Sequence, residues 1–200
     1  MPAGTYSILR QDGSVEGTED FRCAPGPVGW RYFSEVDTVE PVPHHETIDV
    51  AVDADWRPVR LRVDTGAHQL LLEADGDRFA GWRDGQALET PWHPEMHLDY
   101  LSPAFNAITC RRLSDTAEIE VTFVDPYTLE LHVVHQRYEP HGDEDVVTPV
   151  GTFSATRFTY TALDSGWTSE LWCAQDVVVR YERLFRLERY EAGASGPRPV

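Results

Sequence analysis

Residues 58–86, PVRLRVDTGAHQLLLEADGDRFAGWRDGQ, decide the fold class of this chain. Every second residue from Val59 to Val63 is apolar and arginines lie between them, which is the pattern of a strand with one buried face. Two further apolar runs follow, and the pairs Asp75-Gly76 and Asp84-Gly85 come directly after them. Asp-Gly between such runs is the strongest short-range hairpin signal. The stretch therefore predicts a meander of antiparallel strands.

The same pattern extends over the rest of the chain. We expect strands at Thr47–Val52, Pro58–Val63, His68–Glu73, Arg78–Trp82, Glu118–Phe123, Thr128–Tyr138, Gly151–Ala162, Trp167–Cys173, Val177–Tyr181 and Leu184–Tyr190. A polar loop is expected at His141–Asp145 and one short helix around Pro103–Thr109. Many antiparallel strands without a long helix favour partial closure, because closure reduces exposed edges. The predicted fold is mainly β, an antiparallel β-roll or half-closed barrel.

A faint internal repeat raises the question of whether the roll is built from two similar halves. The sequence Gly17-Thr18-Glu19, with Phe21 and then Gly29-Trp30, is echoed by Gly151-Thr152-Phe153 and then Gly166-Trp167. The chain is either built from two similar halves or contains two similar hairpins by coincidence. With 200 residues, of which 41% are hydrophobic, it predicts one domain over residues 1–191 and a flexible tail at 192–200.

The charge of the chain excludes several functions. The formal net charge is −17, from 34 acids and 17 bases, and every base is arginine. An acidic surface repels phosphate backbones, so neither nucleic acid nor an anionic membrane surface is an expected partner. Without lysine, Schiff-base catalysis and P-loop phosphate binding are excluded.

Cysteine use and the N-terminus predict a cytoplasmic protein. Cys23, Cys110 and Cys173 are odd in number and far apart, which suits reduced thiols. No signal peptide is visible at the N-terminus, and no apolar run approaches the length of a membrane-spanning helix.

Residues 99–113, DYLSPAFNAITCRRL, resemble the signature of the "Putative glycolipid-binding" family, roughly D-x-x-T-P-x-T-N-x-x-P-x-R-R-L. Phe105 and Thr109 depart from the family's Thr and Pro. The matching or conservatively substituted positions are Asp99, Ser102, Pro103, Asn106, Arg111, Arg112 and Leu113. The segments Val52–Arg57, Pro126–Tyr138, Phe158–Tyr160, Trp167–Leu171 and Val178–Tyr181 follow in the family's order, so the resemblance covers about residues 46–190.

The resemblance implies a roll akin to half-barrel lipoprotein carriers that holds a small amphiphilic or hydrophobic molecule, with no cofactor. Phe105 replaces a hydroxyl with a ring and would make the site more apolar. The predicted ligand-binding residues are Asp99, Tyr100, Phe105, Asn106, Arg111, Gln136, Tyr138 and Trp167. We place Arg111 and Arg112 on a strand, where one of them faces inward. The inward arginine either pairs with Asp99 to close the barrel or binds an anionic head group.

Two histidine groups leave alternatives open. If residues 93–99 are extended, His93, Glu95, His97 and Asp99 share one face, which could hold a metal, although Pro94 interrupts strand pairing. The simpler interpretation is a polar loop, and we predict no metal.

The second group, His132, Gln136 and Tyr138, shares one strand face. Either this group or the residues from His93 to Asp99 could supply acid–base groups. An enzyme of small-molecule metabolism, of the cyclase, isomerase or hydratase type, is therefore the alternative to a binding protein. A protein-interaction module with one exposed sheet face is a third possibility, and the sequence does not decide the oligomeric state.

Overall fold

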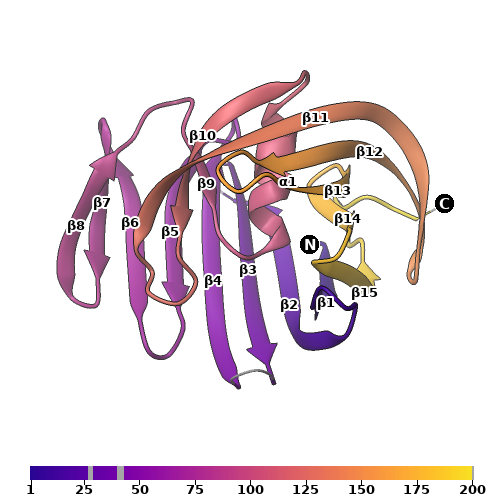
Figure 1. Cartoon of the computed structure of the whole chain (residues 1–200), viewed down its shortest axis with the longest axis horizontal. Coiled ribbons are helices and arrows are strands. Elements are labelled where there is room, and N and C mark those ends of the chain that lie inside the picture. Colours follow the sequence, from indigo (N-terminus) through magenta and orange to yellow (C-terminus); the bar gives the residue numbers. More distant parts are fainter. Residues whose placement is uncertain (27–28, 40–42, 200) are drawn as a thin grey trace.

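The computed structural model describes residues 1–26, 29–39 and 43–199, and within them it contains one helix and one sheet of 15 strands (Figure 1). The helix is α1 (Pro103–Arg112). The strands are β1 (Ala3–Leu9), β2 (Val15–Pro25), β3 (Gly29–Thr38), β4 (His44–Asp53), β5 (Pro58–Asp64), β6 (Gln69–Asp75), β7 (Arg78–Arg83), β8 (Gln86–Pro91), β9 (His97–Asp99), β10 (Ala117–Val124), β11 (Leu131–Thr148), β12 (Gly151–Ala162), β13 (Trp167–Ala174), β14 (Val177–Tyr181) and β15 (Phe185–Glu191).

The sheet is built from two meanders that meet at the chain's first and last strands. The order is β8 to β1, then β15 to β9, so β1 lies between β2 and β15. All neighbours are antiparallel except β9, which pairs with β10 in parallel. Strands β8 and β9 are the two ends of this order, so the described sheet curls into an open roll without closing into a barrel. The predicted fold class, a mainly β half-closed roll, is confirmed.

The hairpin signals are confirmed at the level of backbone conformation. Gly76 and Gly85 have φ of 66° and 77°, and Asp84 shares the left-handed region with φ of 51°. Asp84 and Gly85 form the two-residue turn between the paired residues Arg83 and Gln86, and two positive φ values are what an Asp-Gly hairpin turn requires. In the first hairpin Asp75 pairs with Arg78, so the turn residues are Gly76 and Asp77, with the positive φ at Gly76. The predicted strands Gly151–Ala162 and Val177–Tyr181 coincide with β12 and β14, and the others begin or end within a few residues of the observed strands.

Strand β11 differs from the prediction at both ends. It begins at Leu131 instead of Thr128, because the Asp125 carboxylate accepts hydrogen bonds from the N–H groups of Tyr127 and Thr128 and forms a turn. It continues through His141–Asp145, where a loop was predicted. A register shift between Pro140 and Asp143 absorbs these residues, and Gly142 supplies a φ of 87°. The polar residues 141–145 therefore belong to an exposed, bulged part of a hairpin strand and not to a loop.

The helix is longer than predicted and continues to Arg112. Ser102 caps its N-terminus and accepts from the Ala104 N–H at 3.3 Å, Pro103 follows, and Arg111 and Arg112 end the last turn. This order follows the usual start signals, and arginine in the last turn suits the helix dipole. The placement of Arg111 and Arg112 on a strand was therefore wrong.

Helix α1 lies in the interior of the roll. Every residue from Pro103 to Cys110 is buried, as expected of a helix that is covered on all sides. Figure 1 shows the helix between the strands of the first half and those of the second half, and hydrogen bonds to Glu19 on β2 and Tyr138 on β11 agree with that position. The helix therefore occupies the space where a half-barrel would otherwise be hollow.

Candidate functional site

Four of the eight predicted ligand-binding residues form one hydrogen-bond network, which we call the polar quartet. Gln136 Nε2 donates to Asp99 Oδ2 at 2.6 Å, and the Tyr138 hydroxyl donates to Gln136 Oε1 at 3.3 Å. Asn106 Nδ2 donates to the Tyr138 hydroxyl oxygen at 2.9 Å. The quartet therefore joins β9, α1 and β11 through side chains that are far apart in the sequence.

Burial shapes the protonation of the quartet. Removal from water raises the pKa of Asp99 to about 6, and the hydrogen bond from Gln136 offsets only part of this rise. Burial also holds the pKa of Tyr138 well above its ordinary value, so this residue stays a phenol. Near neutral pH the quartet therefore presents a carboxyl group that gains or loses a proton easily, two amides and one hydroxyl.

Aromatic rings continue from the quartet along the second half of the roll. The ring centroids of Tyr138 and Tyr160 are 5.2 Å apart, those of Tyr160 and Trp167 are 5.6 Å apart, and those of Trp167 and Tyr181 are 6.5 Å apart. Trp167 is only partly buried and lies where this row of rings reaches the surface. The predicted residue Trp167 thus joins the site through aromatic contacts.

A cavity of about 360 Å³ lies at the C-terminal end of α1. Cys110 lines it and lies one helical turn after Asn106, so both residues are on the same side of the helix. The other lining residues come from the end of α1 and the loop after it, from β11, β12 and β13, and from the turn after β13, and they are Arg111, Leu113, Ser114, Pro140, Gly142, Thr156, Phe158, Cys173 and Gln175. The cavity therefore lies about one turn beyond the polar quartet.

A second set of polar contacts holds the start of α1 against the first half of the roll. Ser102 and Tyr32 both donate to Glu19 Oε1, at 2.7 and 2.9 Å. Burial raises the pKa of Glu19 to about 7, and Glu19 Oε2 has no hydrogen-bond partner among the described residues. The predicted residue Tyr100 belongs to this set, because its hydroxyl donates to Glu46 at 2.8 Å.

Glu19 and Glu46 were not predicted as part of the site. Both are acidic residues in strands with alternating polarity, where an outward position is the ordinary expectation. Their spacing from apolar neighbours was the one indication that they are buried. Glu19 is two residues from Phe21 and Glu46 is two residues from Ile48, so each glutamate shares a strand face with a buried apolar residue.

The arginines of the signature do not reach Asp99. The Arg111 guanidinium is exposed and lies 5.1 Å from the ring centroid of Trp56, where it forms a cation–π contact. Arg112 donates to the carbonyl oxygens of Met96 and Pro94. The proposed pairing of an inward arginine with Asp99 was wrong, because the helix continues through both arginines and carries them past the buried network.

The remaining predicted residue, Phe105, packs with its ring edge against Tyr100 at 6.1 Å between centroids. It is buried and belongs to the hydrophobic core.

The histidine-rich segment before Asp99 is not one extended face. His93 and Glu95 are exposed in a turn, and β9 begins only at His97. His97 lies within hydrogen-bond distance of Thr109 Oγ1 (3.2 Å), and burial together with the nearby charge of Arg112 lowers its pKa to about 3. The described residues hold no group of three or more His, Cys, Asp or Glu arranged for a metal ion.

The three acid–base candidates on β11 do not lie together either. Gln136 and Tyr138 are buried in the quartet, whereas His132 is exposed near the start of the strand. No histidine therefore joins the quartet in the described part of the chain.

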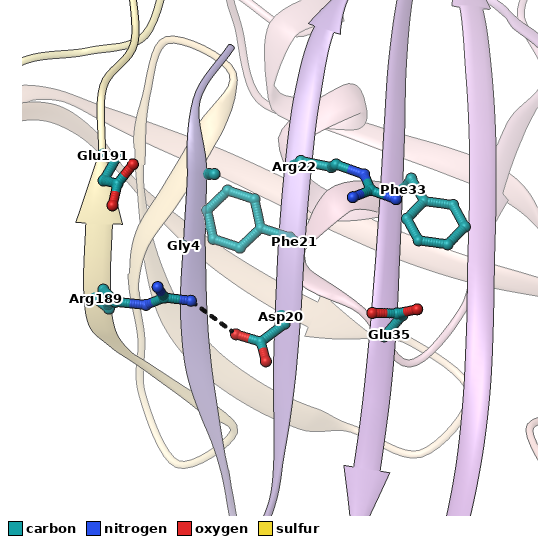
Figure 2. Close-up of a pocket in the computed structure, with 9 residues that line it drawn as sticks. Gly4, Asp20, Phe21, Arg22, Phe33, Glu35, Arg189 and Glu191 are labelled. Carbon is teal, nitrogen blue, oxygen red and sulfur yellow. Dashed lines mark hydrogen bonds and ion pairs between the residues drawn. The ribbon is translucent and has the colours of Figure 1, made fainter.

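Figure 2 shows a different pocket, on the surface formed by β1, β2, β3 and β15. It measures about 210 Å³, and five charged residues line it, two of which form an ion pair with each other. Arg189 forms an ion pair with Asp20 at 3.3 Å, and the Arg22 guanidinium lies 4.6 Å from the centroid of the Phe33 ring. It contains none of the predicted site residues.

The model of the "Putative glycolipid-binding" family matches residues 10–186 of this chain. The chain belongs to this family. The match begins between β1 and β2, upstream of residue 46, where the resemblance in the sequence began. It therefore covers most of both halves of the roll.

Solved structures show the same fold. The family member described here is 21% identical to a DUF1089-family protein from Pseudomonas aeruginosa, with a TM-score of 0.58 over 84% of this chain and 91% of the other. It also matches a beta-barrel-like protein of the domain of unknown function DUF1849 from Brucella abortus, with a TM-score of 0.54, 7% identity and coverage of 95% and 96%. Comparison with curated proteins found no match.

Within the described ranges of this glycolipid-binding-family protein, no helix has the length and apolar composition that crossing a membrane requires.

Proposed function

We propose that this glycolipid-binding-family protein binds a lipid-like molecule with an uncharged, hydroxyl-rich head group inside the roll. The observation that carries the proposal is the polar quartet, which gathers a carboxyl group, two amides and a phenol on the inner side of the sheet. Such groups offer donors and acceptors together, as sugar hydroxyls require. Family membership supports the same class of ligand.

The surroundings of the quartet suit the apolar part of such a molecule. The row of rings from Tyr138 to Trp167 runs from the quartet towards the surface, and aromatic faces pack well on sugar rings and alkyl chains. The cavity beside Cys110 provides space one turn along α1. A longer ligand requires α1 to shift, because the helix fills the interior.

Direct binding of dodecyl maltoside below its micellar concentration tests this proposal. We expect saturable binding, followed by calorimetry and by tryptophan fluorescence, since Trp167 lies in the row of rings that starts at Tyr138 of the quartet. Asn106→Leu removes a donor from the quartet at similar volume and should weaken binding about tenfold, the value of one to two hydrogen bonds.

Thr109→Val is the matched control for this variant. Thr109 is on the same helix and is equally buried, but it lies within hydrogen-bond distance of His97, outside the quartet. Equal loss of affinity in both variants, or no saturable binding by the wild type, would contradict the proposal.

The second candidate function is an acid–base enzyme acting on the bound molecule. One observation favours it, the rise in the pKa of Asp99 to about 6, since groups that titrate near neutral pH suit proton transfer. Asp99→Asn separates the two functions. In both cases the variant should still bind its ligand. If the protein is an enzyme, the wild type should convert co-purified ligand and Asp99→Asn should not, and mass spectrometry of the ligand measures this difference. If the protein only binds, neither the wild type nor the variant should change the ligand.

A further inference from the structure

A groove of about 500 Å³ lies where the tip of the β11–β12 hairpin meets the turn between β14 and β15. The hairpin bends at its bulge, and Figure 1 shows its tip reaching the region of β14 and β15. Thr148 fixes the tip by donating to the Gly151 carbonyl oxygen at 2.8 Å. The groove is separate from the polar quartet, because none of the four quartet residues lines it.

Three arginines line this groove together with one carboxylate. Arg180 pairs with Glu182 at 3.5 Å and lies over the Trp172 ring, and Arg186 pairs with Glu188 outside the groove. Arg183 lies in the β14–β15 turn with φ of 65° and is exposed. Among the described residues, none forms a hydrogen bond or ion pair with its guanidinium. A free, forked donor thus projects beside two partly neutralised arginines.

The groove also has apolar lining residues, two of which are exposed to solvent. Val147 is 77% exposed at the hairpin tip, Pro149 beside it is exposed, and Leu9 contributes from the end of β1. The groove therefore combines exposed apolar groups with three arginines. Such a surface matches a molecule with an anionic head and an alkyl chain.

The net charge of the whole chain favours a small anionic ligand over an extended anionic surface. With a net charge of −17, the protein repels extended anionic surfaces such as membranes or nucleic acids. A small molecule with one anionic group is attracted by the arginines of the groove and contacts little of the remaining acidic surface. The volume of the groove also lies in the range of small-molecule pockets.

We propose that this groove is a second binding site, which takes a single-chain amphiphile with an anionic head group. Arg183 binds the head group, a phosphate monoester or a carboxylate, and Val147 and Leu9 cover the chain. This site differs from the interior site in the charge of the head group that it prefers.

Calorimetry with dodecyl phosphate and dodecanoate tests the proposal, with both kept below their micellar concentrations. We expect each to bind at least about tenfold more tightly than dodecyltrimethylammonium, which has the same chain and the opposite charge. The two anionic ligands distinguish a phosphate head from a carboxylate. Inorganic phosphate alone should bind far more weakly than dodecyl phosphate, because it lacks the apolar contact.

Arg183→Gln should weaken binding of the anionic ligands about tenfold, and Val147→Ser should weaken it less. Arg62→Gln is the matched control, since Arg62 is exposed on β5, far from the groove in the sheet order. Equal affinity of Arg183→Gln and wild type would overturn the proposal, as would equal binding of the cationic amphiphile.

The two sites can fail independently. Arg183→Gln should leave dodecyl maltoside binding unchanged, and Asn106→Leu should leave dodecyl phosphate binding unchanged. Loss of both ligands in either variant would mean that one site takes both, which contradicts the separate groove.

Discussion

At the scale of residues, the notable groups are two carboxyls that the fold buries against neutral partners. Glu19 accepts from Ser102 and Tyr32, and Asp99 accepts from Gln136. Burial raises both pKa values, to about 7 and about 6. Each carboxyl therefore binds its proton more tightly in the folded state than in the unfolded state, which links the stability of the protein to pH.

Glu19→Gln should flatten this pH dependence. The pKa of Glu19 is raised above its unfolded value of 4.5, so its contribution is fully present below about pH 4.5 and is lost as pH rises through about 7. The loss is on the order of 3 kcal/mol by the usual conversion of pKa shifts. Urea unfolding at pH 5 and pH 8 measures it. Glu35→Gln, at an exposed position of β3, should keep the wild-type slope, and an unchanged slope in Glu19→Gln would contradict the assignment.

Half of the polar quartet was predictable from strand parity. Gln136 and Tyr138 are two residues apart, so any regular strand places them on one face. Their contact with Asn106 and Asp99 depends on α1 entering the roll, which no local pattern encodes. The placement of Arg111 on a strand was wrong for the same reason, because this residue lies in the last turn of α1.

At the scale of elements, α1 is the component that was hardest to predict. Its residues carry almost no amphipathic pattern, since all sides of the helix are covered. The start signals Ser102 and Pro103 were readable, and they located the beginning of the helix correctly. Its end was not readable, because Cys110 and the two arginines suit a strand or a helix equally well. The meander strands, in contrast, carry their own turn chemistry.

Ser102→Ala should destabilise the protein by about 2 kcal/mol. Ser102 accepts from the Ala104 N–H and donates to Glu19, so the substitution removes a helix cap and leaves a buried carboxyl with one fewer donor. Denaturant unfolding measures the loss. Ser114→Ala is the comparison, because Ser114 is exposed just after α1 and should change the free energy of unfolding by less than about 0.5 kcal/mol. Similar losses in both variants would rule out a special role for Ser102.

At the scale of the whole molecule, β1 joins the two halves of the roll. Tyr6 is almost fully buried on this strand, stacks on Phe21 of β2 at 4.8 Å and meets the ring of Phe185 of β15 at 6.2 Å. Its hydroxyl also donates to the carbonyl oxygen of Val178 on β14. One side chain thus contacts both meanders, and α1 is hydrogen-bonded to both. We therefore expect the two halves to unfold together as one domain.

Tyr6→Ala tests this expectation, because loss of a buried aromatic side chain costs about 3–5 kcal/mol. The indole N–H signals of Trp30 in the first half and Trp167 in the second provide separate probes of unfolding by NMR. In the wild type both should disappear at one urea concentration, and in Tyr6→Ala both should shift to lower urea by the same amount. Tyr127→Ala, at a turn position that is 82% exposed, should leave both midpoints in place. A shift confined to one tryptophan would show that the halves are separate folding units, and β1 would then belong to only one of them.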